Sequence, residues 1–400
     1  MMAKRRTAII HYWLVGMRGG ERVLERLIRL FPEGDIFTHV YDPKSVSDVI
    51  NGQRVKTTFI QRLPGSRKHY QKYLPLMPLA LEQLDLRGYD LVISSESGPT
   101  KGVITGPDAQ HICYCHSPMR YLWDHYHDYR ASAGKLARAA MPLAFHQLRK
   151  WDTASAARVD HFVANSTFVQ RRIEKAYRRR STVIHPPVET DLFRPSPDIE
   201  NRYLWVGQMT AYKRADLALE AFNKLGLPLL MVGDGELSER IKRRAGPNIT
   251  IVPRLSFDEL RAAYARCRAL IFTAEEDFGI VPVEAMASGR PVIAYGRGGA
   301  LDTVVPGVTG LLFPEQTADS LIGAVEALER WLPDFNPLAA VKQAERFGPD
   351  RFDREFMAVV AGARPPLFDY PLIPQGGPGE VDHDWPVVGA KVRTTADGYR

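Results

Sequence analysis

The stretch that decides the fold is residues 269–295, ALIFTAEEDFGIVPVEAMASGRPVIAY. Two apolar runs in it, residues 269–273 and 291–294, predict buried strands of a parallel sheet. Between them the sequence predicts one short helix, because Pro282 is tolerated only in a first turn and Gly289 is typical of a helix end. A strand, a helix and a second strand in this order indicate an α/β fold.

Two glutamates in this stretch are candidates for ligand binding. Glu276 falls on the predicted loop between strand and helix, and Glu284 falls one turn inside the helix. One interpretation is that Glu284 only complements the helix dipole, which is worth about 0.3–1 kcal/mol. The other is that both carboxylates bind a ligand, because ligands of parallel α/β sheets bind at the carboxyl ends of the strands.

The composition predicts an ordinary globular protein of two or three domains, with 400 residues, 45% apolar and 25% charged. No uncharged apolar run approaches the roughly 18 residues of a membrane-spanning helix, and we interpret the N-terminus as a first strand rather than a leader. Three cysteines, Cys113, Cys115 and Cys267, are too few for a disulfide framework and favour a reducing compartment.

Charge is distributed unevenly along the chain. Residues 1–190 hold 29 Lys and Arg against 17 Asp and Glu, a net charge of +12, whereas the remainder carries −5. The basic first half therefore predicts an anionic partner. Residues 62–84 interleave basic, aromatic and aliphatic side chains. They fit either an interfacial membrane segment or a loop and helix that pack on their own domain.

The first half predicts a parallel sheet with a polar edge. Its expected strands are residues 7–13, 35–40, 89–95, 111–116 and 160–166. Gly19 and Gly20 follow the first strand, where they would either form a structural turn or let the backbone approach a phosphate. His116 ends the fourth strand at the same edge, as a ligand contact or as a structural histidine. Cys113 and Cys115 alternate along that strand without a second ligand pair, so we expect no metal site.

The second half alternates strands and helices more regularly and predicts a doubly wound parallel sheet. Four prolines, Pro186, Pro187, Pro195 and Pro197, indicate a linker between the halves. We therefore predict two Rossmann-like domains that face a central cleft. The expected divisions are a first domain at residues 1–190, a second domain at 191–345, a helix at 346–364 that packs back on the first domain, and a Pro/Gly-rich tail at 365–400.

Several motifs together resemble those of the family-4 retaining glycosyltransferases, which have the two-domain GT-B fold. EEDFGIVPVE resembles the family's E-x7-E signature, and further matching motifs occur in the family's order: GGERV, YCHSPMRYLWD, VIHPPVETDLF, VGQMTAYKRADLALEAF and VGDGE. The resemblance implies transfer of a sugar from a nucleotide-sugar to a hydroxyl group. It also implies retention of the anomeric configuration and activity without a metal or cofactor.

The resemblance also implies roles for individual residues. His116, Lys213 and Glu276 would act at the reacting sugar and diphosphate, and Glu284 would bind the ribose. The implied donor-binding set is Gly19, Gly20, Gln208, Lys213, Arg214, Gly233, Gly235, Arg254, Phe278, Gly279, Ile280 and Glu284. Gln208 departs from the family, which usually has arginine there, and this change removes a charge from the diphosphate site. Lys213, Arg214 or Arg254 could compensate.

The central stretch is most similar to mannosyltransferases that build bacterial surface polysaccharides such as lipopolysaccharide. It therefore implies a hexosyltransferase that uses GDP-mannose, with UDP- or dTDP-sugars as alternatives, and a lipid-linked saccharide as acceptor. We expect a cytoplasmic protein bound peripherally to the anionic inner face of the plasma membrane, without nucleic-acid binding because no such module is recognisable. The non-catalytic alternative is a GT-B protein that only binds a nucleotide or glycan. An epimerase would give product without an acceptor.

Overall fold

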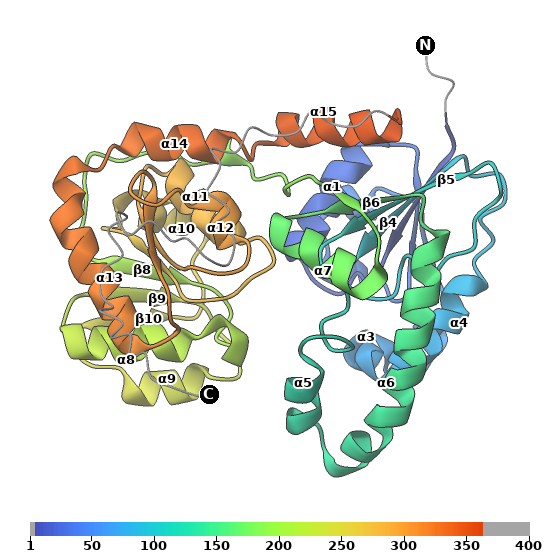
Figure 1. The fold of residues 1–400 in the computed structure, drawn as a ribbon, viewed down its shortest axis with the longest axis horizontal. Helices are drawn as coiled ribbons and strands as arrows, with labels where there is room; N and C mark the ends of the chain where they lie inside the picture. The colour runs from blue at the N-terminus through green and yellow to red at the C-terminus, as the bar shows by residue number, and fades with distance from the viewer. Residues whose placement is uncertain (1–4, 363–400) are drawn as a thin grey trace, which may run out of the picture. The chain divides into compact units, whose positions relative to one another are not determined.

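The computed structural model describes residues 5–362, which form two α/β units (Figure 1). By their contacts, residues 5–189, 277–280 and 346–362 make up the first unit, and residues 190–276 and 281–345 make up the second. The predicted tail at 365–400 lies outside the described residues. Within the described part, no helix combines the length and apolarity needed to cross a bilayer.

The first unit contains a seven-stranded sheet in the order β3-β2-β1-β4-β5-β6-β7, and every neighbouring pair is parallel. Its strands are β1 Thr7–His11, β2 Asp35–Thr38, β3 Val55–Thr57, β4 Leu91–Glu96, β5 Gln110–Cys115, β6 His161–Ala164 and β7 Ser181–Val183. The central strands β1 and β4 are buried along their whole length, as expected for a sheet covered on both faces.

The helices of the first unit have very different lengths. Those before the second unit are α1 Gly19–Leu30, α2 Asp48–Asn51, α3 Ser66–His69, α4 Met77–Glu82, α5 Tyr126–Ser132, α6 Lys135–Ser155 and α7 Thr167–Tyr177. Residues 62–84 fold as the short helices α3 and α4 joined by a 3-10 segment, η3 Tyr70–Leu76. Met77, Ala80 and Leu81 of α4 are buried, so this segment does pack on its own domain.

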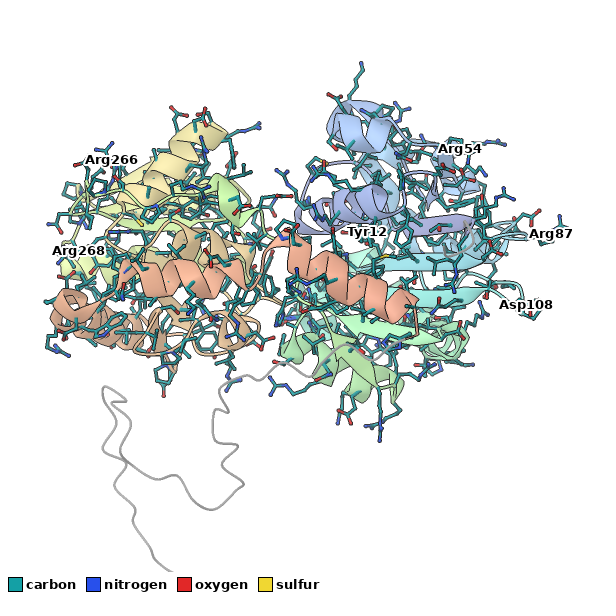
Figure 2. The ribbon with its side chains drawn as sticks, turned by 90° about the horizontal axis from the view of Figure 1, so that it is seen from above. Tyr12, Arg54, Arg87, Asp108, Arg266 and Arg268 are labelled. Atoms are coloured by element: carbon teal, nitrogen blue, oxygen red, sulfur yellow. The ribbon has the colours of Figure 1, made fainter. Side chains whose placement is uncertain are left out.

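The last described helix, α15 Pro349–Val360, belongs to the first unit although the chain reaches it after the whole second unit. Seen from above, it lies across that unit (Figure 2). Phe352 and Phe356 are fully buried, and their rings contact the ring of Tyr114 on β5 at centroid distances of 5.7 and 6.4 Å. Burying a side chain of this size contributes about 1.5–3 kcal/mol, so α15 is part of the core.

The second unit contains a six-stranded parallel sheet in the order β10-β9-β8-β11-β12-β13. Its strands are β8 Tyr203–Val206, β9 Leu229–Val232, β10 Ile249–Val252, β11 Leu270–Phe272, β12 Val292–Tyr295 and β13 Gly310–Phe313. Its helices are α8 Ala215–Leu225, α9 Ser238–Arg244, α10 Phe257–Arg266, α11 Ile280–Ala287, α12 Ala300–Thr303, α13 Ala318–Trp331 and α14 Pro337–Glu345. The predicted doubly wound α/β architecture is confirmed for both units.

Both sheets reverse their strand order at one place, and this place determines where a ligand can bind. In the first unit the reversal lies between β1 and β4, and in the second it lies between β8 and β11. Loops that follow such a pair of strands run to opposite sides of the sheet and leave a crevice at its carboxyl edge. Candidate residues on these loops therefore lie where the topology favours binding.

Candidate functional site

In the second unit, both signature glutamates lie at the carboxyl edge of β11. Glu276 is on the loop between β11 and α11, and Glu284 is in the second turn of α11. Glu284 Oε2 accepts a hydrogen bond of 2.8 Å from the hydroxyl of Tyr264 on α10. Burial and the nearby Glu284 raise the pKa of Tyr264 well above its usual value, so its hydroxyl remains a donor. The partly exposed carboxylate is thus held in one orientation.

Lys213 and Glu276 form an ion pair, and both side chains are 17% exposed. Lys213 ends a short 3-10 segment, η6 Ala211–Lys213, which follows β8. Thr273 Oγ1 at the end of β11 donates to the carbonyl of Lys213 at 2.8 Å, and Trp205 Nε1 of β8 donates to Thr273 Oγ1 at 3.1 Å. Strands β8 and β11 therefore fix the lysine beside the carboxylate at the point where the strand order reverses.

The loop that carries Glu276 rests on a glycine turn after β12. The amide of Gly299 donates to the carbonyl of Glu276 at 2.8 Å. Gly298 has φ +70°, and a Cβ there would lie 2.4 Å from the same carbonyl oxygen. Only glycine allows so close an approach. The segment GRGG, residues 296–299, therefore helps to fix the position of the Glu276 backbone relative to the sheet.

Gly233 and Gly235 have a structural reason to be glycine. A Cβ at Gly233 would lie 1.8 Å from the carbonyl oxygen of Gly207, and one at Gly235 would lie 2.7 Å from that of Met209. The amide of Gly235 donates to Asp234 Oδ1 at 2.8 Å and to Ser238 Oγ at 2.7 Å. The turn after β9 is therefore closed by its own side chains and packs tightly against the loop after β8.

The three residues considered around the departure at Gln208 lie in different surroundings. Gln208 is exposed immediately after β8, and Arg254 is exposed after β10. Arg214 has a left-handed backbone conformation, φ 53°, and its Nε donates to Asp216 Oδ1 at 3.3 Å. Lys213 is the cation that the fold holds at the reversal between β8 and β11, so it is the strongest candidate for compensation.

Residues 277–280 lead into α11, whose first residue is Ile280, and their contacts group them with the first unit. Asp277 accepts a hydrogen bond of 2.6 Å from Arg172 Nη1 on α7 and also pairs with Arg120. Phe278 is buried and stacks on His185 at a centroid distance of 5.3 Å. Gly279 has φ +86°, a conformation that other residues rarely adopt. Neither arginine contact to Asp277 was predicted from the sequence.

In the first unit, the glycine turn forms the start of α1. Gly19 and Gly20 are the first two residues of that helix. A Cβ on Gly20 would lie 2.3 Å from the hydroxyl oxygen of Tyr12, a side chain that Figure 2 labels. The second glycine is thus required by packing, and the free amides of the helix start lie at the carboxyl edge of β1.

His116 is the first residue after β5 and is only partly exposed. Its amide donates to the carbonyl of Glu96 at 2.8 Å, and its Nε2 lies 2.9 Å from Ser95 Oγ. Burial is the main cause that lowers the pKa of His116 to about 3, so the ring is neutral near pH 7. A neutral imidazole at this edge can exchange hydrogen bonds with a sugar hydroxyl.

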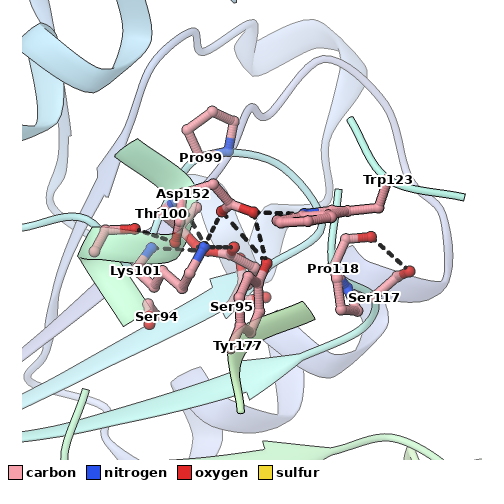
Figure 3. Close-up of polar contacts among 12 residues, drawn as sticks. Ser94, Ser95, Pro99, Thr100, Lys101, Ser117, Pro118, Trp123, Asp152 and Tyr177 are labelled. Atoms are coloured by element: carbon pink, nitrogen blue, oxygen red, sulfur yellow. Dashed lines mark hydrogen bonds and ion pairs between the residues drawn. The ribbon is translucent and has the colours of Figure 1, made fainter. Parts of the chain in front are cut away.

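A buried polar network that sequence reasoning missed fixes the loop after His116 (Figure 3). Lys101, which is fully buried, forms ion pairs with Glu96 at 2.8 Å and with Asp152 on α6. Burial opposes the charge on Lys101, but the two carboxylates hold its pKa above the ordinary value. Asp152 Oδ2 also accepts a hydrogen bond of 2.8 Å from Trp123 Nε1, which anchors the loop that contains Arg120.

The described residues hold no group of three His, Cys, Asp or Glu side chains that could bind a metal ion. Cys113, Cys115 and Cys267 are free and buried. We assign these thiols to the packed interior, where small apolar residues are usual.

Two family models match the chain. The model for Glycosyltransferase Family 4 matches residues 17–192, and the model for Glycosyl transferases group 1 matches residues 191–343. Together they cover the first half, with the glycine turn and His116, and the second half, with the glutamate signature. The first half of the chain is therefore similar to family 4 glycosyltransferases, and the second half is similar to group 1 glycosyl transferases.

Curated relatives match parts of the chain at low identity. An uncharacterized glycosyltransferase of Methanocaldococcus jannaschii is 29% identical over 167 residues, which are 40% of this chain and 47% of that protein. An alpha-1,3/1,6-mannosyltransferase of Schizosaccharomyces pombe is 27% identical over 253 residues, 51% of this chain and 48% of its own length. The chain thus spans about half the length of the curated relatives it matches.

Solved structures share the fold over most of the chain. A sucrose-phosphate synthase from Thermosynechococcus elongatus has a TM-score of 0.68 at 18% identity and covers 90% of this chain and 99% of its own. HepE of Anabaena, solved with UDP and glucose, has a TM-score of 0.64 at 16% identity and covers 88% of this chain and 99% of its own. At these identities the likeness shows the fold alone.

Proposed function

We propose that this chain, a glycosyltransferase of the GT-B type with a family 4 domain and a group 1 domain, transfers mannose from GDP-mannose to a hydroxyl of a lipid-linked saccharide. Transfer retains the anomeric configuration and needs no metal ion. The observation that carries the proposal is the cluster of Lys213, Glu276 and Glu284 at the carboxyl ends of β8 and β11. It combines a cation for a diphosphate with two carboxylates for sugar hydroxyls.

The chemistry follows from where charge develops. Breaking the bond at the anomeric carbon leaves negative charge on the departing diphosphate, and a cation held in place lowers that barrier. Lys213 supplies this cation, and the diphosphate competes with Glu276 for it. Glu276 then becomes available to accept hydrogen bonds from the donor sugar. We propose that the acceptor hydroxyl attacks the anomeric carbon on the same face of the sugar that the diphosphate leaves, and that the departing diphosphate takes the hydroxyl proton.

Support for mannose comes from the signature stretch, and the relative from Schizosaccharomyces pombe is named as a mannosyltransferase. A UDP-sugar is the alternative donor, because HepE was solved with UDP and glucose. Calorimetric titration with GDP, UDP and dTDP distinguishes them, and we expect GDP to bind most tightly. Tighter binding of UDP would indicate a UDP-sugar as the donor, and the proposed transfer of a sugar to a hydroxyl would be unchanged.

A turnover measurement distinguishes a glycosyltransferase from a protein that only binds a nucleotide or glycan. We expect the chain to release GDP from GDP-mannose faster in the presence of a polyprenyl-diphosphate-linked saccharide, with EDTA without effect. NMR of the product should show the anomeric configuration of the donor. Nucleotide binding without turnover above the protein-free rate would instead support the non-catalytic alternative, and product formed without acceptor would indicate an epimerase.

We further propose that the first unit binds the anionic inner face of the plasma membrane through α3, η3, α4 and α6. Arg67, Lys68 and Lys72 are exposed on α3 and η3. Apolar side chains on these elements are exposed as well, to 41% for Leu76, 51% for Leu79, 90% for Leu136 and 71% for Leu143. Basic residues near such a surface contribute about 1 kcal/mol each, and exposed leucines can enter the interface.

Vesicle flotation tests this surface. Arg67→Glu, Lys68→Glu and Lys72→Glu combined should abolish binding to anionic vesicles at low salt while GDP affinity stays unchanged. The matched control reverses Arg240, Lys242 and Arg243, which are exposed on α9 of the second unit and change the net charge equally. Equal loss of binding in both variants, or no binding of wild type, would contradict the proposal.

A further inference from the structure

Behind His116, three buried side chains form a continuous series that no motif in the sequence indicates. His11 Nδ1 lies 3.0 Å from Ser95 Oγ, and Ser95 Oγ lies 2.9 Å from His116 Nε2. At the other end, His11 Nε2 lies 3.6 Å from Glu21 Oε1. We infer that Glu21, His11 and Ser95 are positioning residues that hold His116 as a neutral ring whose hydrogen-bond acceptor is Nδ1.

The fold brings these groups together through its central strands. His11 on β1 and Ser95 on β4 are partners in the parallel register, although they are 84 residues apart. Glu21 comes from the first turn of α1, immediately after the loop that follows β1. His11 and Ser95 are fully buried, and Glu21 is 2% exposed. Buried polar groups without partners cost about 1–3 kcal/mol each, so this arrangement is strongly determined.

Glu21 is held in place independently of the histidine. Its Oε2 accepts a hydrogen bond of 2.8 Å from the amide of Arg18, which caps α1. The helix N-terminus favours a negative charge at this position. Burial raises the pKa of a carboxyl group, yet His11 and the backbone hydrogen bonds together hold the pKa of Glu21 below its usual value. Glu21 therefore faces His11 as a carboxylate.

The Glu21 carboxylate determines which group donates and which accepts in the hydrogen bonds between His11, Ser95 and His116. Its negative charge lies 3.6 Å from His11 Nε2 and favours the tautomer with the hydrogen of His11 on Nε2 and the lone pair on Nδ1. Ser95 has one hydroxyl hydrogen and donates it to His11 Nδ1. Ser95 Oγ then accepts from Nε2–H of His116, which leaves the lone pair of His116 on Nδ1.

The opposite direction requires a hydrogen on both nitrogens of His11, which is a buried imidazolium. Such a charge needs close and well-aligned partners to offset its desolvation. His11 Nε2 has no hydrogen-bond partner in the described chain, and the carboxylate oxygen remains 3.6 Å away. A His11 ring with its hydrogen on Nε2 therefore places the acceptor at His116 Nδ1.

The consequence for transfer rests on the proposed function. An acceptor nitrogen at His116 takes a hydrogen bond from a sugar hydroxyl, whereas an N–H group there would reverse that hydrogen bond, because the hydroxyl oxygen would then have to accept. Loss of the series lets the ring rotate and exchange tautomers, so fewer molecules present the correct nitrogen. Turnover falls, and folding is affected only as much as by the loss of any comparable buried hydrogen bond.

NMR of the full chain with 15N-labelled histidine measures the tautomer without any substrate. The His116 signals are identified by their absence in His116→Gln. We expect hydrogen on Nε2 and none on Nδ1 in wild type at pH 7.5. Ser95→Ala and Glu21→Gln should give a mixture of tautomers, and Glu21→Gln retains an oxygen to cap Arg18. Hydrogen on Nδ1 in wild type, or an unchanged tautomer in both variants, would overturn the inference.

Ser94→Ala is the matched control. Ser94 is the neighbouring residue on β4, is equally buried, and bonds another buried histidine, His111 Nε2, at 2.9 Å. We expect Ser95→Ala and Glu21→Gln to lower kcat roughly tenfold with the donor KM and the Tm close to those of Ser94→Ala. If His116→Gln itself lowers kcat, equal kcat in all three variants would contradict the inference.

The variant His116→Gln tests the role of His116 in sugar transfer separately from the positioning series behind it. If it transfers sugar at the wild-type rate while the NMR tautomers behave as expected, the positioning series stands and the proposed role of His116 in transfer fails.

Discussion

Tyr264 illustrates how one buried hydroxyl can determine the orientation of a binding group. The ring is fully buried on α10, and the hydroxyl is 2.8 Å from Glu284. A carboxylate that is free to rotate would have to be ordered when it binds a ribose, and this ordering would weaken binding. The hydrogen bond from Tyr264 orders the Glu284 carboxylate when the chain folds, so ribose binding does not have to order it.

We therefore expect Tyr264→Phe to weaken binding of the free nucleoside diphosphate about fivefold, the effect of losing one hydrogen bond of about 1 kcal/mol. Calorimetric titration measures it. The control is Tyr203→Phe, because the Tyr203 hydroxyl binds Glu329 of α13 and Tyr203 starts β8 at the opposite edge of the sheet. Similar losses in both variants would show that Tyr264 acts only through general stability.

Glu276 and Glu284 should respond differently to substitution. Glu284→Ala should weaken binding of the free nucleoside diphosphate, because a ribose contact is present with or without the sugar. Glu276→Gln removes the competitor for Lys213, so affinity for the free diphosphate should stay equal or rise while turnover of the sugar nucleotide falls. Titration and a GDP-release assay measure the two effects, and equal loss of nucleotide affinity in both would reverse the assigned roles.

The start of α1 depends on a close approach that only glycine permits. Gly20→Ala would place a methyl group 2.3 Å from the Tyr12 hydroxyl, whereas a Cβ on Gly16 meets nothing within 4 Å. We expect Gly20→Ala to cost about 1–3 kcal/mol and to lower the Tm by several degrees. Gly16→Ala should leave the Tm within about a degree. A heat scan followed by circular dichroism checks both, and equal Tm values would contradict the packing argument.

Elements with strong local patterns could be predicted from the sequence. The apolar runs gave the central strands of both sheets to within about two residues at each end, for example residues 7–13 against β1 Thr7–His11. Strands β3 and β7 were missed because each has three residues and no buried side chain. The end of α7 at Tyr177 has no apolar signal, because it is set by Arg178, which turns into a left-handed conformation, φ 55°, ahead of β7.

The candidate site also contains residues that could be located from the sequence and residues that could not. Glu276 and Glu284 could be located because a strand, a loop and a helix follow one another within 27 residues. The series from Glu21 to His116 could not, because parallel pairing of β1 with β4 brings His11 to Ser95 and leaves no short spacing in the sequence. The ion pair of Lys101 with Asp152 could not be predicted for the same reason, since Asp152 is 51 residues from Lys101.

At the scale of the whole molecule, buried histidines make the fold sensitive to acid. Burial lowers the pKa of His39 to about 4, that of His111 to about 4 and that of His185 to about 3. In the unfolded chain these rings titrate near 6.5. Below that pH the unfolded state binds protons that the folded state does not, so stability falls as the pH falls from 6.5 towards 4.

Each of these histidines should contribute a loss of roughly 3 kcal/mol at pH 4. We expect the Tm to be nearly constant between pH 7 and 8 and to drop steeply between pH 6 and 4.5. His39→Gln keeps one donor and one acceptor for Thr58 and Pro99, which His39 contacts at 3.2 and 3.1 Å. This variant should flatten the profile. A Tm independent of pH in that interval would show that these rings can be protonated without unfolding.

The position of α15 also has a consequence for synthesis. The ribosome makes the chain from its N-terminus, so the first sheet is complete once β7 has emerged, but Phe352 and Phe356 of its core are still to be translated. At ~5–20 residues per second, the roughly 160 intervening residues take about 8–30 s. Throughout that interval the apolar residues that α15 covers are exposed, and chaperones or neighbouring chains can bind them. Truncation before α15 would make that exposure permanent.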